Sequence, residues 1–148
     1  MTTYSFATTR LVNQSGTEPV VTEEQLWKGL EFKARNPTAR FRPDDLFEQG
    51  CKKLVRELTV GTTVIREEIE VNEATIVYFE MDTGLRVMNV ISYGPNDELL
   101  LTYSFANGIP GVPADKPKPS AKELNANIGK SVERGIAIIR QMAKEGKL

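Results

Sequence analysis

Histidine is absent from this chain of 148 residues, and cysteine occurs once, as Cys51. Without histidine the chain cannot form a Ser-His-Asp or Cys-His catalytic triad, a histidine-ligated metal site or the commonest general base near neutral pH. A single cysteine excludes an intramolecular disulfide and a cysteine-rich metal site. Any acid–base chemistry must therefore come from carboxylates, lysine, tyrosine or Cys51, and we expect Cys51 to be a small buried residue rather than a reactive thiol.

Charge bias and long apolar runs are also lacking. Nineteen lysine and arginine residues stand against twenty aspartate and glutamate residues, and the net charge of −1 gives no broad positive field for nucleic acid or anionic lipid. No apolar run approaches the roughly 20 residues of a membrane-spanning helix, and no signal-peptide pattern opens the chain. Glycine-rich nucleotide loops and calcium-loop spacing are missing too. We therefore expect a cytoplasmic protein with no metal or nucleotide cofactor, no nucleic-acid partner and no membrane insertion.

Turn signals, by contrast, recur at regular intervals in the second and third quarters of the chain. They are Gln49-Gly50, Gly61-Thr62, Asn72-Glu73, Thr83-Gly84 and the stretch 94–97. Such signals between apolar and β-branched segments predict consecutive antiparallel hairpins. Together with one strand near the N-terminus, the predicted strands are residues 4–12, 45–47, 53–60, 63–71, 74–82, 85–93 and 99–106.

A first helix is predicted to begin at Thr22, which is followed three residues later by Gln25. This spacing is a capping box, in which two side chains satisfy backbone N–H groups of the first turn. The helix stops at Asn36-Pro37, which leaves room for a short second helical turn at 38–41. Trp27 lies on the apolar stripe of this helix. We favour a position in the hydrophobic core, and contact with a ligand is the alternative.

A long second helix is predicted at the C-terminus. Ser120 and Glu123 form another capping box, and apolar residues then recur at helical spacing through 120–145. The length of the chain favours one domain covering residues 1–148. The predicted fold class is α+β, with a seven-stranded curved antiparallel sheet wrapped around the long C-terminal helix and two short helices after the first strand. A curved sheet that grips one helix is expected to leave a cavity between them.

This order of elements resembles the helix-grip order of the START-like, Bet v1-like superfamily, also called SRPBCC, over nearly the whole chain. Three segments are similar to its AtaL-like branch, a family of largely uncharacterised function: Lys-Ala-Arg-Asn-Pro at 33–37, Leu-Val-Arg-Glu-Leu at 54–58 and Asn-Val-Ile-Ser-Tyr-Gly at 89–94. The resemblance implies an elongated hydrophobic pocket between sheet and C-terminal helix. Superfamily members use that pocket for lipids, sterols, polyketides or other bulky apolar ligands, and some are cyclases.

Counting residues across the predicted turns brings polar side chains together on the inner face of the sheet. A two-residue loop after the strand 53–60 sets Arg56 opposite Glu67. Two-residue loops at 72–73 and 83–84 place Tyr78 beside Glu67 and Asn89 beside Tyr78. A three-residue turn at 95–97 places Tyr103 beside Asn89. A few convergent polar groups in an apolar pocket are typical of a small-molecule site.

The strand 74–82 leaves this row open to a second interpretation. Val77, Phe79 and Met81 form a more apolar set than Ile76 and Tyr78, and the two sets compete for the inner face. A bulge or a subunit contact at this strand would remove Tyr78 from the row.

The row has a functional and a structural interpretation. In the functional one, Glu67 is a ligand anchor or general base, and Arg56 holds a carboxylate or enolate. Asn89 and Tyr103 would then orient a carbonyl or hydroxyl group. In the structural one, Arg56 and Glu67 form a buried ion pair, because inward charges are tolerated only when they are paired.

Three functions fit these observations. The favoured one is binding of a bulky, mainly apolar small molecule, lipid- or polyketide-like, in the cavity. The first alternative is a cofactor-free polyketide cyclase, aromatase or dehydratase in which Glu67 or a tyrosine moves protons. The second alternative is a protein-interaction module with a filled pocket, in which an exposed apolar patch pairs two subunits as a homodimer.

Overall fold

The computed structural model describes residues 3–35, 53–72 and 74–148, which form six strands and two helices. In chain order these are β1 (Phe6–Leu11), α1 (Glu23–Arg35), β2 (Lys53–Val60), β3 (Thr63–Asn72), β4 (Ile76–Met81), β5 (Arg86–Tyr93), β6 (Leu99–Ala106) and α2 (Ala121–Lys144). Each of the six strands begins and ends within two residues of a predicted strand. The predicted seventh strand at 45–47, the predicted helical turn at 38–41 and Cys51 lie outside the described residues.

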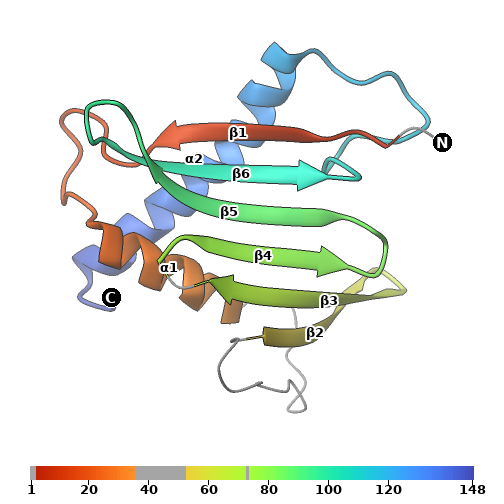
Figure 1. Cartoon of the computed structure of the whole chain (residues 1–148), viewed down its shortest axis with the longest axis horizontal. Helices are drawn as coiled ribbons and strands as arrows, with labels where there is room; N and C mark the ends of the chain where they lie inside the picture. Colours follow the sequence, from red (N-terminus) through yellow and green to blue (C-terminus); the bar gives the residue numbers. More distant parts are fainter. Residues whose placement is uncertain (1–2, 36–52, 73) are drawn as a thin grey trace.

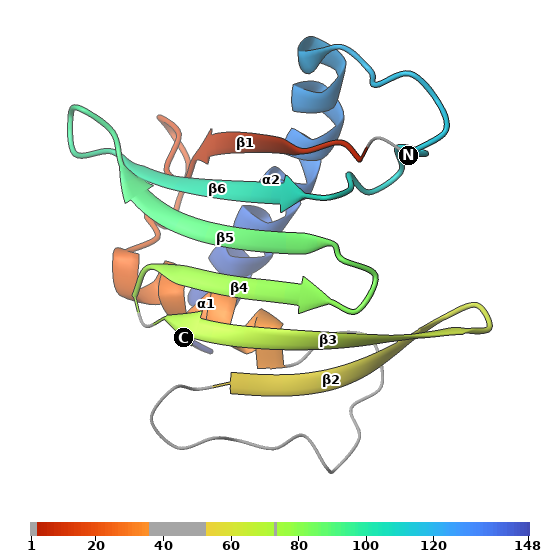
Figure 2. The ribbon, with the colours of Figure 1, turned by 45° about the vertical axis from the view of Figure 1, so that its right-hand side comes forward.

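The six strands make one antiparallel sheet in the order β1-β6-β5-β4-β3-β2. Figure 1 shows α2 running diagonally across one face of this sheet, and Figure 2 shows α1 on the same face, below β6 in that view. Helix α2 contacts β1 and β6, whereas α1 contacts β4, β5 and α2. This confirms the predicted α+β arrangement of an antiparallel sheet with a long C-terminal helix against it.

Both predicted capping boxes are present. The hydroxyl of Ser120 accepts a hydrogen bond from the backbone N–H of Glu123 at 3.2 Å, and the Glu123 carboxylate accepts one from the Ser120 N–H at 3.3 Å. Thr22 and Gln25 make the same reciprocal pair at 3.2 and 3.1 Å. These bonds satisfy donors that a helix start otherwise leaves free, and they explain why both helix starts could be located from local sequence.

The register of the sheet confirms two predicted neighbours and corrects two others. Arg56 lies opposite Glu67, and Asn89 lies opposite Tyr103, as predicted. The placement of Tyr78 beside both Glu67 and Asn89 is wrong: the partner of Glu67 is Met81, and the partner of Asn89 is Val77.

The physical reason is the length of two loops. Asn72 pairs with Ile76, so three residues separate β3 from β4 where two were expected. At the next turn, the backbone N–H of Met81 donates to the carbonyl of Leu85 at 2.9 Å. Three residues therefore lie between Met81 and Leu85 as well, where a two-residue loop was expected. Because side chains alternate between the faces of a sheet, an odd change in loop length turns a whole strand over relative to its neighbour.

Helix α2 is held close to β1 by an arginine that lies against a glycine. A Cβ atom on Gly129 would collide with the guanidinium group of Arg10. That group donates to the carboxylate of Glu133 at 3.1 Å and to the side-chain and backbone oxygens of Asn125 at 3.0 and 2.7 Å. The hydroxyl of Thr8, on the same strand, also donates to the Asn125 side chain at 2.6 Å. The absence of a side chain at residue 129 therefore permits the polar contact that joins α2 to the sheet edge.

We predict that Gly129→Ala destabilises the protein by about 1–2 kcal/mol, because the guanidinium must leave and its charged hydrogen bonds are lost. Helix propensity alone predicts the opposite sign, since alanine is favoured over glycine by about 1 kcal/mol inside a helix. The exposed Asn127 on the same helix supplies the control variant Asn127→Ala. Urea denaturation followed by circular dichroism measures both, and a stabilised Gly129→Ala protein would contradict the prediction.

Candidate functional site

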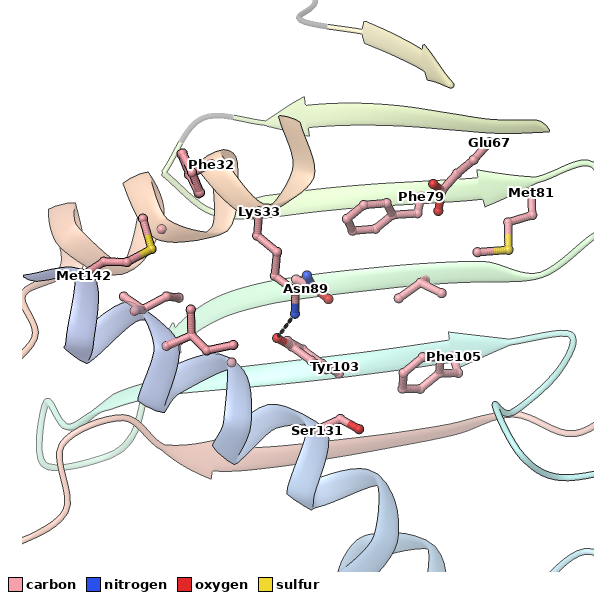
Figure 3. Close-up of a pocket in the computed structure, with 15 residues that line it drawn as sticks. Phe32, Lys33, Glu67, Phe79, Met81, Asn89, Tyr103, Phe105, Ser131 and Met142 are labelled. Atoms are coloured by element: carbon pink, nitrogen blue, oxygen red, sulfur yellow. Dashed lines mark hydrogen bonds between the residues drawn. The ribbon is translucent and has the colours of Figure 1, made fainter. Parts of the chain in front are cut away.

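A cavity of about 490 Å³ lies between the inner face of the sheet and the two helices. Figure 3 shows side chains converging on it from α1, α2 and strands β3 to β6. The residues that line it are Gly29, Phe32, Lys33, Glu67, Phe79, Met81, Val87, Asn89, Tyr103, Phe105, Ser131, Gly135, Ile138, Ile139 and Met142. The cavity expected between sheet and C-terminal helix is therefore present, and α1 supplies part of its wall.

The sheet side of the cavity consists of cross-strand rows with different chemistry. Asn89 and Tyr103 are direct partners and form a polar row. The next row is apolar and contains Phe79, Val87 and Phe105. The third row pairs Glu67 with Met81.

These rows replace the single polar row that the sequence predicted. Successive rows on one face are two residues apart along each strand, and one residue advances about 3.3 Å, so the two polar rows lie about 13 Å apart. Asn89 and Tyr103 thus lie at one end of the sheet wall, and Glu67 lies at the other. Figure 3 shows Phe79 and Phe105 between these two ends.

Lys33 of α1 reaches the polar row from the opposite wall. Its Nζ atom donates to the hydroxyl of Tyr103 at 3.1 Å and lies 5.2 Å from the centroid of the ring. A Cβ on Gly135 would come within 2.5 Å of the same hydroxyl oxygen. Gly135 therefore leaves the space in α2 that lets the tyrosine hydroxyl and the lysine meet under the helix.

Asn89 is the least satisfied polar side chain of this wall. It is 5% exposed and lines the cavity. Within residues 3–35, 53–72 and 74–148, no hydrogen bond involves its side-chain amide. A buried amide without a partner costs about 1–3 kcal/mol, so its retention at a cavity surface calls for a binding role or a bound solvent molecule.

Glu67 occupies the far end of the cavity and is 2% exposed. It projects from β3, where the backbone register places Arg56 of β2 directly opposite. The structure does not describe the side chain of Arg56, so the predicted ion pair stays a prediction.

The predicted site residues therefore fall into two groups. Glu67, Asn89 and Tyr103 line the cavity. Tyr78 does not, because β4 is turned over and its hydroxyl donates to Glu80 at 3.1 Å. Trp27 is 6% exposed and belongs to the hydrophobic core rather than to the cavity wall.

Sequence reasoning missed Lys33 as a site residue, although a signal was available. Lys33 lies three residues after Leu30 and seven after Leu26, both of which are buried, so helical periodicity puts all three on one side of α1. A charged residue at the edge of an apolar stripe is usually interpreted as solvent-exposed. The partner of Lys33 is Tyr103 on β6, and only the packing of α1 against the sheet shows this contact.

The described part of the chain contains no cluster of three or more histidine, cysteine, aspartate or glutamate side chains placed to hold a metal ion. Within that same part, neither helix is long and apolar enough to span a bilayer.

A protein family described as "AtaL: Acetylaranotin biosynthesis cluster protein L" matches the chain over residues 6–146. No curated protein matches it. The fold is similar to that of the di-domain ARO/CYC StfQ from the steffimycin biosynthetic pathway, with a TM-score of 0.55 and 11% identity over 95% of this chain and 50% of that one. The chain thus spans about half the length of StfQ, and a likeness at this identity concerns the fold alone.

A second solved structure, the Zhui aromatase/cyclase from Streptomyces sp. R1128, aligns over 95% of this chain and 92% of its own. The identity is 11% and the TM-score is 0.42, which is too low to support an argument.

We predict that Tyr78→Phe leaves ligand binding in the cavity unchanged within about twofold, because the side chain lies on the other face of the sheet. Burial, followed by the hydrogen bond to Glu80, raises the pKa of the Tyr78 hydroxyl above its ordinary value. The hydrogen bond to Glu23 also raises the pKa of Tyr93. Ultraviolet titration should therefore show two tyrosines that ionise late in the parent protein and only one in the variant. A loss of binding in Tyr78→Phe would show that the register of β4 is wrong.

Proposed function

The chain belongs to the AtaL family, and from this premise we propose that it binds a bulky, mainly apolar small molecule, lipid- or polyketide-like, between the sheet and α2. The observation that carries the proposal is the cavity of about 490 Å³ with a largely apolar wall. Ligand sites commonly measure about 300–1,000 Å³ and combine such a wall with a few placed polar groups. Asn89, Tyr103 and Glu67 supply those groups here.

The binding function needs no nucleotide or metal, and we propose a cytoplasmic protein that works without either.

The protein-interaction alternative required a pocket filled by the protein's own side chains, and the open cavity counts against it. Phe32 and Ile138 are both about half exposed beside the cavity. They form an apolar rim that suits the entry of a hydrophobic ligand, and a homodimer formed through this rim would compete with entry.

A cofactor-free cyclase, aromatase or dehydratase is the second candidate, and the buried carboxylate of Glu67 favours it. A general base must lie within hydrogen-bond reach of the proton it removes, and Glu67 faces the same cavity as the apolar row. The similar fold of StfQ, itself described as an ARO/CYC, supports keeping this alternative.

We predict that filling the cavity abolishes binding. Val87 lines the middle of the sheet wall, and Val87→Trp should weaken the binding of a neutral hydrophobic dye such as Nile red at least about tenfold, which corresponds to about 1.4 kcal/mol. Val64 is exposed on β3, does not line the cavity, and supplies the matched control Val64→Trp. Fluorescence titration measures both affinities, and circular dichroism establishes that each variant is folded. Equal dye affinity in the two variants would place the ligand elsewhere.

Glu67→Gln separates binding from catalysis. If the protein only binds, the variant retains ligand and no product forms with either protein. If the protein is an enzyme, the parent converts a polyketide-like substrate and the variant loses about 100-fold or more of the rate while still binding, because general acid–base catalysis contributes about that much. Mass spectrometry of the reaction mixture distinguishes the two results.

A further inference from the structure

We propose that Lys33, Asn89 and Tyr103 form a binding site for an anionic oxygen of the ligand, such as an enolate, phenolate or carboxylate joined to an apolar body. This inference rests on the proposed function, because it assigns a chemical class to the molecule that the cavity takes. It adds that a purely neutral lipid or sterol is not the preferred ligand.

The first observation is the buried amide of Asn89. Its side chain lines the cavity, and its N–H groups have no acceptor among the residues that the structure describes. A ligand oxygen would satisfy one of them, whereas a hydrocarbon would leave the amide buried without a partner. The site thus favours a ligand with an acceptor at this point of the sheet.

The second observation is the way in which Tyr103 is engaged. Its hydroxyl oxygen accepts a hydrogen bond from Lys33. The proton of that hydroxyl is therefore directed elsewhere, and no hydrogen bond within the described residues takes it up. Tyr103 lies directly opposite Asn89 in the sheet, where side-chain Cβ atoms are about 5 Å apart. Two unused donors, one N–H and one O–H, consequently lie side by side.

The third observation is the charge that accompanies these donors. The ammonium group of Lys33 has three N–H bonds, and one of them is used by Tyr103. No ion pair to Lys33 occurs in the described part of the chain. Glu67, on the same cavity wall, lies in the row about 13 Å away along the strands. Among residues 3–35, 53–72 and 74–148 the cation therefore has no ion-pair partner, and a ligand anion would supply one.

The position of Lys33 also explains why an anion can bind without excessive loss of hydration. Lys33 is an exposed residue of α1, and only its amino end reaches the tyrosine. Charged hydrogen bonds at such a partly hydrated site are stronger than neutral ones, while the desolvation cost stays below that of a fully buried pair. The apolar body of the ligand would then extend along Phe79 and Phe105, as the arrangement in Figure 3 indicates.

Two matched pairs of probes test this assignment. Naphthoate and its methyl ester compare a carboxylate with a neutral analogue, and lawsone, an acidic enol, and its methyl ether compare an enolate with one. Each probe displaces Nile red, a neutral dye, so the dye alone reports whether the cavity binds a small molecule. We expect at least one anion to bind about tenfold or more tightly than its neutral partner at neutral pH.

Variants then locate the preference. In Lys33→Met and in Asn89→Leu the advantage of the anion should fall below about threefold, while Nile red still binds. Lys130 is exposed on α2 and does not line the cavity, so Lys130→Met changes the net charge equally and should keep the full preference. If Asn89→Leu does not fold, Tyr103→Phe removes the neighbouring donor and should reduce the preference in the same direction.

The outcomes separate this inference from the function on which it rests. Dye binding without any preference for either anion overturns the anion site and leaves the proposed function intact. A preference that persists in Lys33→Met also overturns it, because the anion then binds elsewhere. If neither the dye nor any probe binds, both proposals are wrong. Which of the two anions shows the larger advantage identifies the acidic group that the site prefers.

Discussion

The close approach of α2 to the β1 edge of the sheet is the constraint from which the rest of the arrangement follows. It depends on Gly129, which leaves room for the guanidinium of Arg10, and on the hydrogen bonds of that group to Asn125 and Glu133. Held over β1 and β6, the helix cannot also cover the strands at the other side of the sheet. The uncovered inner face is shared between α1 and the cavity, and the position of the ligand site is a consequence.

A second close approach determines the chemistry of that cavity. Gly135, less than two turns further along α2, admits the hydroxyl of Tyr103, and Lys33 reaches the same point from α1. Three elements thus meet at one polar spot in an otherwise apolar wall. Glycine costs about 1 kcal/mol relative to alanine inside a helix, so Gly129 and Gly135 both lower the helix propensity of α2. Gly129 permits the contact of α2 with Arg10 on β1, and Gly135 permits the contact with the hydroxyl of Tyr103.

The sequence predicted the elements well because their signals are local. Capping boxes at Thr22 and Ser120, helical periodicity in α2 and glycine or asparagine at the turns each act over a few residues. The same locality explains the correct pairs Arg56 with Glu67 and Asn89 with Tyr103, since each spans one hairpin whose loop was counted correctly. The predicted family was confirmed as well.

The site was predicted less completely, because it depends on loop lengths and on packing between distant segments. One additional residue in each of two loops turned β4 over, brought Phe79 and Met81 inward and moved Tyr78 to the other face. The competing apolar set in β4 had pointed to this outcome without deciding it. Lys33 was not predicted as a site residue because its partner, Tyr103, lies 70 residues later in the chain. No local sequence pattern connects the two residues.

The cavity between sheet and helices is proposed to hold a small molecule whose polar end lies against Asn89. The most direct measurement is a crystal structure of the protein with the tightest-binding probe. We expect ligand density along Phe79 and Phe105, with a ligand oxygen about 3 Å from the side-chain nitrogen of Asn89. Density for the probe on the outer face of the sheet, with the cavity occupied by water alone, would contradict it.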